Sequence, residues 1–268
     1  MDFSLSEEQT LLQDSVRKMM DKVATPEYIR RLDKEQAYPY ELYQSWVDLG
    51  LLALPFPETY GGLGGSVMDM VILAEEISRK SADFYMAYAG SVFCGLNVAR
   101  KGSEEQKKFW LPRLLSGEVR FSISMSEPDA GTDIGAMRTT AVRDGDHYVI
   151  NGQKLWSTGS GAKDTVINLY VRTDPKANIR QGMSLFLVDN DTPGLKLRKL
   201  DMLGRRCTGT YEIFLDNVRV PADRLVGTEN AGWDVVLSGL QVERITSAAG
   251  NVGAAQAALD LAVAYARE

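Results

Sequence analysis

The sequence predicts an α+β chain with an N-terminal all-α domain, a middle β domain and one long final helix. Apolar residues recur at helical spacing up to about residue 117. Short β-prone runs separated by turn residues begin after Val119. Helical spacing returns from about Ala231 and continues to the last residue. We therefore expect domains at residues 1–118, 119–228 and 229–268.

The first part carries the signals that begin and end helices. Ser6 with Gln9, and Ser103 with Gln106, have the spacing of capping boxes, in which serine and glutamine side chains satisfy free backbone donors. Gly50 and Gly117 stand where two helices should stop. The expected helices follow Ser6 to about residue 23 and cover about 39–49, 68–79, 82–99 and 104–116. The Pro- and Gly-rich stretch 55–65 is expected to be a connector.

The middle part contains seven short runs typical of strands: 121–125, 141–142, 148–150, 165–171, 184–188, 195–197 and 210–215. Turn signals lie between them at Asp144-Gly145, Asn151-Gly152, Thr192-Pro193-Gly194 and Asp216-Asn217. Several short consecutive strands predict a compact antiparallel barrel or sandwich.

The final predicted helix is longer than most. Its length of roughly 30 residues compares with a usual ~11–12. One face is apolar, with Leu237, Leu240, Ile245, Val252, Ala255, Leu259 and Val263. Small residues from Ala248 to Ala254 would let another helix approach closely. No residue that ends helices follows, so the helix either packs between subunits or the chain stops inside a helical domain, and we favour the second.

Composition excludes several functions. The net charge of −6 argues against a nucleic-acid partner. No apolar run is long enough for a membrane span, and the start has no signal-peptide pattern, so a cytoplasmic location is expected. Cys94 and Cys207 are far apart and are expected to be buried and free of metal. His147, the single histidine, follows an Asp-Gly turn and is expected to be a solvated hairpin residue, so no metal site is predicted.

The segment from Ser122 to Ala136 reads Ser-Ile-Ser-Met-Ser-Glu-Pro-Asp-Ala-Gly-Thr-Asp-Ile-Gly-Ala. A strand here runs into a turn that exposes backbone N–H groups and short hydroxyls, which suits a planar ring or a phosphate. Taken alone, this pattern is equally typical of an ordinary strand-to-loop turn.

This segment resembles the signature of the acyl-CoA dehydrogenase family, with Ser124 as its one departure, where the family has Gly, Ala or Cys. Matching motifs occur in the family's order at 55–65, 102–106, 151–156 and 215–221. The N-terminal Met1-Asp2-Phe3-Ser4-Leu5 and Glu243 look most similar to bacterial members of the crotonobetainyl-CoA reductase group. The resemblance implies that the final helix begins a C-terminal four-helix bundle, most of which lies beyond the chain.

The resemblance also implies an FAD-dependent oxidoreductase. A carboxylate would take the Cα proton of an acyl-CoA while a hydride passes from Cβ to flavin N5, or the reverse reaction would reduce an enoyl-CoA. The positions that match flavin-contacting residues are Ile123, Met125, Ser126, Gly131, Thr132, Trp156 and Thr158. Thr132 also matches a position that meets the acyl-CoA. Without the signature, Trp156 would be interpreted as a β-domain core residue.

Glu243 is the predicted catalytic base, because Gln241-Val242-Glu243-Arg244 matches the position of the base in isovaleryl- and long-chain-type members. Arg244 would help to orient the substrate. The competing interpretation is an exposed Glu-Arg step on a helix, which the flanking Val242 and Ile245 weaken. Arg206 matches a recurrent family arginine, but we interpret it as a structural residue that binds nearby loop carbonyls.

Alternatives within the same fold are an acyl-CoA oxidase and a flavin monooxygenase. A third is a catalytically incompetent fragment, since a chain that ends inside the bundle should expose an apolar helix face and bind FAD weakly. The partners implied by the resemblance are an acyl-CoA substrate, an electron-transfer flavoprotein and, at full length, further copies in a homotetramer or homodimer.

Overall fold

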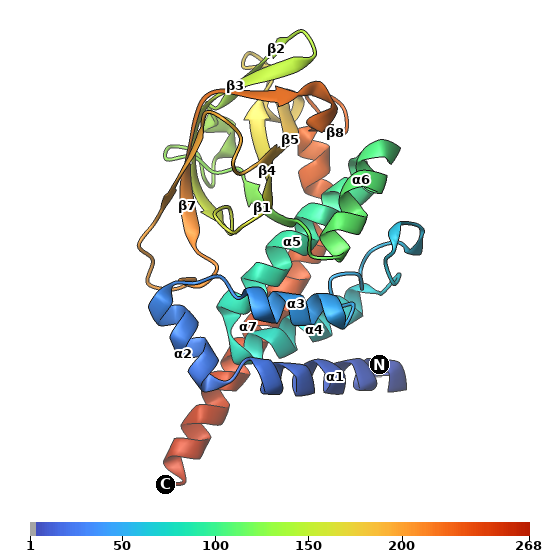
Figure 1. Cartoon of the computed structure of the whole chain (residues 1–268), viewed down its shortest axis with the longest axis vertical. Coiled ribbons are helices and arrows are strands. Elements are labelled where there is room, and N and C mark those ends of the chain that lie inside the picture. Colours follow the sequence, from blue (N-terminus) through green and yellow to red (C-terminus); the bar gives the residue numbers. More distant parts are fainter. Residues whose placement is uncertain (1–3) are drawn as a thin grey trace.

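Helices form the first part of the chain and its end, and a β-sheet lies between them (Figure 1). The computed structural model describes residues 4–268, so Met1 to Phe3 of the N-terminal motif lie outside it. The helices are α1 (Glu7–Val23), α2 (Pro26–Glu35), α3 (Tyr40–Asp48), α4 (Val67–Lys80), α5 (Ala82–Lys101), α6 (Glu104–Leu115) and α7 (Gly232–Ala266). Short 3-10 turns occur at Glu58–Tyr60, Ile134–Ala136, Ile179–Gln181 and Ala222–Arg224. The order of these elements confirms the predicted fold class.

The capping signals begin helices where the sequence predicts them. The Ser6 hydroxyl accepts from the Gln9 N–H at 3.2 Å, and the Gln9 side chain accepts from the Ser6 N–H at 3.1 Å. Ser103 and Gln106 make the same reciprocal pair before α6. Helix α2 is absent from the prediction, although Pro26 opens it. This helix is short and mostly charged, although its apolar residues Tyr28, Ile29 and Leu32 keep helical spacing.

One eight-stranded sheet forms the middle of the chain. Its strands are β1 (Arg120–Ser124), β2 (Thr140–Asp144), β3 (His147–Thr158), β4 (Thr165–Arg172), β5 (Met183–Asp189), β6 (Leu195–Lys199), β7 (Thr210–Pro221) and β8 (Leu225–Val226). Their order is β6-β7-β3-β2-β4-β5-β8, and β1 pairs with β4. Most pairs are antiparallel, but β1 runs parallel to β4. The β2–β3 hairpin lies in the connection between them, which gives the chain the length that a parallel pair requires.

Two of the predicted turns are wrong. Asn151-Gly152 lies inside β3 and Asp216-Asn217 lies inside β7, and each strand is 12 residues long. The β3–β7 register shifts between Ile150 and Gly152, which marks a bulge. There the Asn151 side chain accepts from the Asn217 N–H at 2.8 Å. Asn and Gly tolerate the positive φ that bulges and turns share, so the same residues serve either structure.

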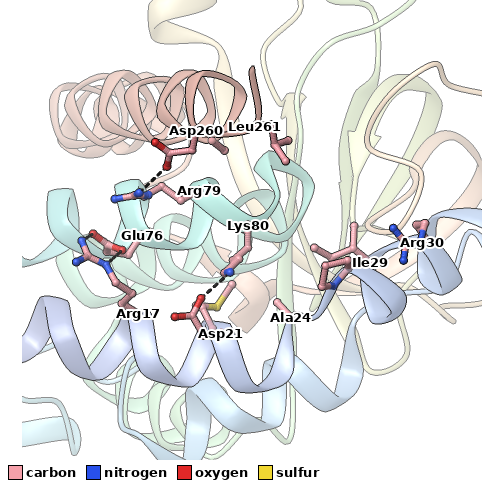
Figure 2. Close-up of a pocket in the computed structure, with 13 residues that line it drawn as sticks. Arg17, Asp21, Ala24, Ile29, Arg30, Glu76, Arg79, Lys80, Asp260 and Leu261 are labelled. Atoms are coloured by element: carbon pink, nitrogen blue, oxygen red, sulfur yellow. Dashed lines mark hydrogen bonds and ion pairs between the residues drawn. The ribbon is translucent and has the colours of Figure 1, made fainter. Parts of the chain in front are cut away.

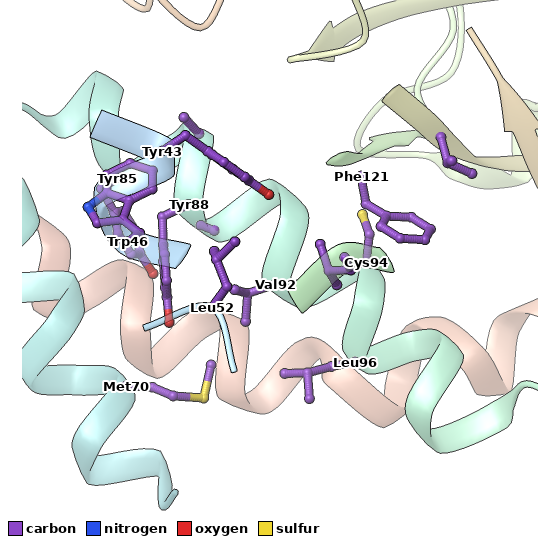
Figure 3. Packing of buried hydrophobic residues seen from close by; sticks show 14 of the residues in the cluster. Tyr43, Trp46, Leu52, Met70, Tyr85, Tyr88, Val92, Cys94, Leu96 and Phe121 are labelled. Atoms are coloured by element: carbon purple, nitrogen blue, oxygen red, sulfur yellow. The ribbon is translucent and has the colours of Figure 1, made fainter. Parts of the chain in front are cut away.

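Helix α5 lies between the other helices and the sheet (Figure 3). Its Tyr88 is buried near Trp46 of α3, with ring centroids 5.8 Å apart. Further along α5, Cys94 is buried in the same core as Phe121 of β1. Both Cys94 and Cys207 are buried and free, as predicted. Helix α5 therefore joins the helical part to the sheet through a single apolar core.

Helix α7 packs its small residues against α4 and leaves its apolar face uncovered. A Cβ atom on Gly253 would lie 2.1 Å from the Glu75 carbonyl oxygen of α4, so only glycine permits this approach. The exposed large side chains of α7 are Leu237, Ile245, Val252, Leu259, Leu261, Val263 and Tyr265. Across residues 4–268, no helix combines the length and apolar character needed to cross a membrane.

Candidate functional site

Strand β1 presents its side chains to two different parts of the molecule. Ser122 and Ser124 are buried, and their hydroxyls hydrogen-bond to those of Ser160 (3.0 Å) and Ser157 (2.6 Å). Because side chains alternate along a strand, Ile123 points the other way and remains 38% exposed. The signature strand thus anchors itself through hydroxyls on one face and offers an apolar surface on the other.

Ile123 lines a cavity of about 80 Å³ between α5, α7 and the sheet. Glu243 of α7 lines the same cavity, although it is far from Ile123 in the sequence. The remaining lining residues include Met86, Phe93, Cys94, Asn97, Arg100, Tyr170, Val236 and Ser247. The fold therefore brings the predicted base together with the signature strand. Arg244 does not line this cavity and is exposed.

Glu243 is half-buried, and burial is the main cause that raises the pKa of its carboxyl group, against a smaller lowering by Arg244. Among residues 4–268, none donates a hydrogen bond to this carboxylate. Its negative charge in turn adds to the effect of burial in raising the pKa of Tyr170 and Cys94. A desolvated carboxylate with free acceptor positions is the kind of group that removes a proton from a weak carbon acid.

Trp156 has an unusual backbone and an exposed side chain. Its φ is 67°, and the β3–β7 register shifts between Lys154 and Ser157 on either side of it. A bulky residue in this region of φ is strained, by about 1–3 kcal/mol. The indole is 56% exposed, while Lys154 and Ser157 are buried. This exposure rules out the alternative that Trp156 is a core residue.

The other predicted flavin-contacting residues follow Ile123 in the loop beyond β1 or lie beside Trp156 in β3, and among the seven predicted contacts Ile123 alone lines the Glu243 cavity. The Ser126 carbonyl accepts from the Leu155 N–H at 2.9 Å, next to Trp156. Met125 is half-buried against the core. The Thr158 hydroxyl shares a hydrogen bond with Thr210 at 3.1 Å.

Gly131 and Thr132 are exposed in that loop, and neither lines the Glu243 cavity. A Cβ atom at Gly131 would meet no atom within 4 Å, so there is open space beside this part of the loop.

No signal in the sequence indicates that Lys154 and Glu127 form a pair, although both are candidates for a functional role. Lys154 is fully buried and pairs with Glu127 at 2.9 Å, directly beneath the signature loop. Regular alternation would place Lys154 on the same face as Trp156, and only the register shift between Lys154 and Ser157, which the sequence does not signal, separates the buried Lys154 from the exposed Trp156. Arg206 and His147, to which the sequence also drew attention, lie outside the Glu243 cavity. The Arg206 guanidinium donates to the Asp33 carbonyl at 3.4 Å, a structural role, and His147 pairs with Asp146 at the β2–β3 hairpin.

A larger groove of about 570 Å³ lies between α1, α2, α4 and the end of α7 (Figure 2). Ion pairs cross it, and they join Arg17 to Glu76, Lys80 to Asp21 and Arg79 to Asp260. Because these charges satisfy one another, the groove presents mainly neutralised groups. The Glu243 cavity, with its unpaired carboxylate, is the better candidate for chemistry.

The succession of a helical part, a mainly antiparallel sheet and a long helix, with a carboxylate at their junction, defines a class of multidomain α+β proteins. The family description "Acyl-CoA dehydrogenase, N-terminal domain" matches residues 6–118. The middle domain of that family matches residues 122–218, and its C-terminal domain matches residues 230–268. The chain belongs to the acyl-CoA dehydrogenase family.

Individual relatives agree with this assignment. A glutaryl-CoA dehydrogenase of Desulfococcus multivorans is 38% identical, over 100% of this chain and 69% of its own length. A mitochondrial isovaleryl-CoA dehydrogenase of Pongo abelii is 37% identical, over 97% of this chain and 62% of its own length. A solved glutaryl-CoA dehydrogenase from Mycobacterium smegmatis in complex with FADH2 has a TM-score of 0.88 and 31% identity, with 97% and 66% of the two chains covered. The chain thus spans 62–69% of the length of these relatives.

Proposed function

We propose that this chain carries the flavin wall and the catalytic base of an FAD-dependent acyl-CoA dehydrogenase. The observation that carries the proposal is the cavity that Ile123 and Glu243 share. The residues present fit a flavin, because Ile123 and Trp156 expose apolar surface that a planar ring would cover. The open space at Gly131 leaves room for a backbone approach.

The residues that would hold FAD are Ile123, Met125, Ser126, Gly131, Thr132, Trp156 and Thr158. When bound, FAD supplies the acceptor for the hydride from the substrate's Cβ. Glu243 removes the proton from Cα, and the apolar surroundings strengthen it as a base by disfavouring its charged form. Arg244, next in the chain, and Thr132 would help to position the acyl-CoA.

The test is substrate-dependent flavin reduction. The full chain is loaded with FAD and mixed without oxygen with straight, branched and carboxylate-ended acyl-CoA esters. We expect the oxidised-flavin absorbance to fall with at least one of them, and the thioester to lose two hydrogens by mass spectrometry. A chain that holds FAD but is reduced by none of these esters would contradict the proposal.

The proposed base also predicts a pH dependence. Glu243 works only when deprotonated, so kcat/KM should fall as pH decreases through its pKa. Because burial raises the pKa of Glu243, this fall should begin above the pH range of an exposed glutamate. Arg244 lowers the pKa, so Arg244→Gln should move the fall to higher pH. The control is Arg267→Gln, an exposed arginine at the end of α7. Identical pH profiles for Arg244→Gln and the unaltered chain would speak against Glu243 as the base.

A further inference from the structure

The loop between β1 and β2 is closed at its base by one buried carboxylate. Glu127 lies near the start of the loop. Its Oε2 accepts from the Arg138 N–H at 2.7 Å, and its Oε1 accepts from the Thr139 N–H at 2.9 Å, at the end of the loop. Gly131 and Thr132, two of the proposed flavin contacts, lie between these points. Glu127 therefore ties the start of the loop to its end, and Arg172 of β4 adds hydrogen bonds to the Gly135 and Met137 carbonyls.

Lys154 of β3 joins this loop to the strand that carries Trp156. Its Nζ donates to Glu127 Oε1 at 2.9 Å and to the Met125 carbonyl at 3.0 Å. The Lys154 side chain is 0% exposed and that of Glu127 is 6% exposed. One ammonium group thus contacts the start of the loop directly and its end through Glu127. The neighbouring residues add a parallel link, since the Leu155 N–H donates to the Ser126 carbonyl.

Stability alone does not account for this pair. Removing two charges from water has a cost that their attraction offsets only partly, and apolar replacements of buried pairs are often neutral or stabilising. Burial lowers the pKa of Lys154 to about 8. Burial acts to raise the pKa of Glu127, but the charge of Lys154 and the surrounding hydrogen bonds lower it overall. Both groups are therefore charged near pH 7, and every polar contact they make holds the loop or β3.

The strained Trp156 needs such support. A residue at φ 67° persists only where its surroundings hold it in place. Lys154 anchors β3 two residues before Trp156, and Ser157 anchors it one residue after, through its hydrogen bond to Ser124. These two anchors lie on either side of Trp156, whose side chain stays exposed.

We propose that Lys154 and Glu127 are positioning residues that hold the β1–β2 loop and Trp156 in the arrangement that binds FAD. The proposal rests on the function proposed above. It predicts that uncoupling the loop from β3 weakens flavin binding even when the fold retains its stability.

The test compares Lys154→Met, Glu127→Gln and the double variant Lys154→Met/Glu127→Gln in the full chain. Each single change leaves one buried charge unpaired, so the melting temperature should fall. The double variant buries no charge, so its melting temperature should return to that of the unaltered chain. Methionine cannot donate to the Met125 carbonyl, so the dissociation constant for FAD in the double variant should stay about tenfold higher, as expected for a lost charged hydrogen bond. Lys163→Met, at an exposed lysine of the same domain, should change neither value.

Amide hydrogen exchange gives a second measurement that does not require FAD. The N–H groups of Arg138 and Thr139 should exchange faster in the double variant than in the unaltered chain. An unchanged FAD dissociation constant in a stable double variant would overturn the proposal, and so would unchanged exchange at these two amides. If the unaltered chain binds no FAD, the proposed function fails, and the exchange rates alone decide whether the pair positions the loop.

Discussion

Replacing Glu243 with glutamine is expected to lower the rate of substrate-dependent flavin reduction by about two to four orders of magnitude, the usual contribution of a positioned general base. Glutamine keeps the size of the side chain and can still accept a hydrogen bond, but it cannot take up the Cα proton. Because the Glu243 carboxylate is half-buried and receives no hydrogen bond from residues 4–268, we expect little loss of stability.

The rate is measured by stopped-flow absorbance at saturating acyl-CoA, above the pKa of Glu243. Asp234→Asn is the matched control, since Asp234 is an exposed carboxylate on the same helix and outside the cavity. It should reduce flavin at the unaltered rate. Glu243→Asp should retain part of the activity, because the base remains but is shorter. A Glu243→Gln variant as fast as the unaltered chain would mean that another group removes the proton.

Arg17→Met is expected to destabilise the chain by about 3 kcal/mol, the lower end of the cost of breaking a buried ion pair. Glu76 of α4 is 2% exposed, and both of its oxygens bind Arg17 of α1, at 2.6 and 3.0 Å (Figure 2). Removing the guanidinium leaves a buried carboxylate without its counter-ion. The lower end applies because Arg17 is 42% exposed, which lets water reach the vacated position.

Urea unfolding measures this change in free energy. The double variant Arg17→Met/Glu76→Met should recover most of the loss, since no charge then remains buried. Arg31→Met is the matched control, because Arg31 forms ion pairs with the exposed Glu35 and Glu41 and lies over the Tyr28 ring, and its loss should cost about 1 kcal/mol. A loss in Arg17→Met no larger than in this control would show that water already solvates Glu76.

Local signals in the sequence were sufficient for the helices other than α2 and for much of the sheet. The capping boxes at Ser6 and Ser103 need only residues three apart, so they could be recognised without knowledge of the fold. The turn signals at Asn151-Gly152 and Asp216-Asn217 were misleading for the opposite reason. Whether such residues make a turn or a bulge depends on the strand that lies opposite. Here Asn151-Gly152 of β3 lies opposite Asp216-Asn217 of β7.

The features of the candidate site likewise fall into those that local sequence signals predict and those that depend on contacts between distant elements. The sequence by itself determined the order of helical part, sheet and long helix, together with the family motifs that indicate a flavin wall. Only the tertiary structure decided that Ile123 and Glu243 share a cavity, that Lys154 pairs with Glu127, and that α4 is the helix against which the small residues of α7 pack. Spacing reports which residues share a face of one element, whereas burial, pairing and the resulting pKa shifts arise between elements far apart in the chain.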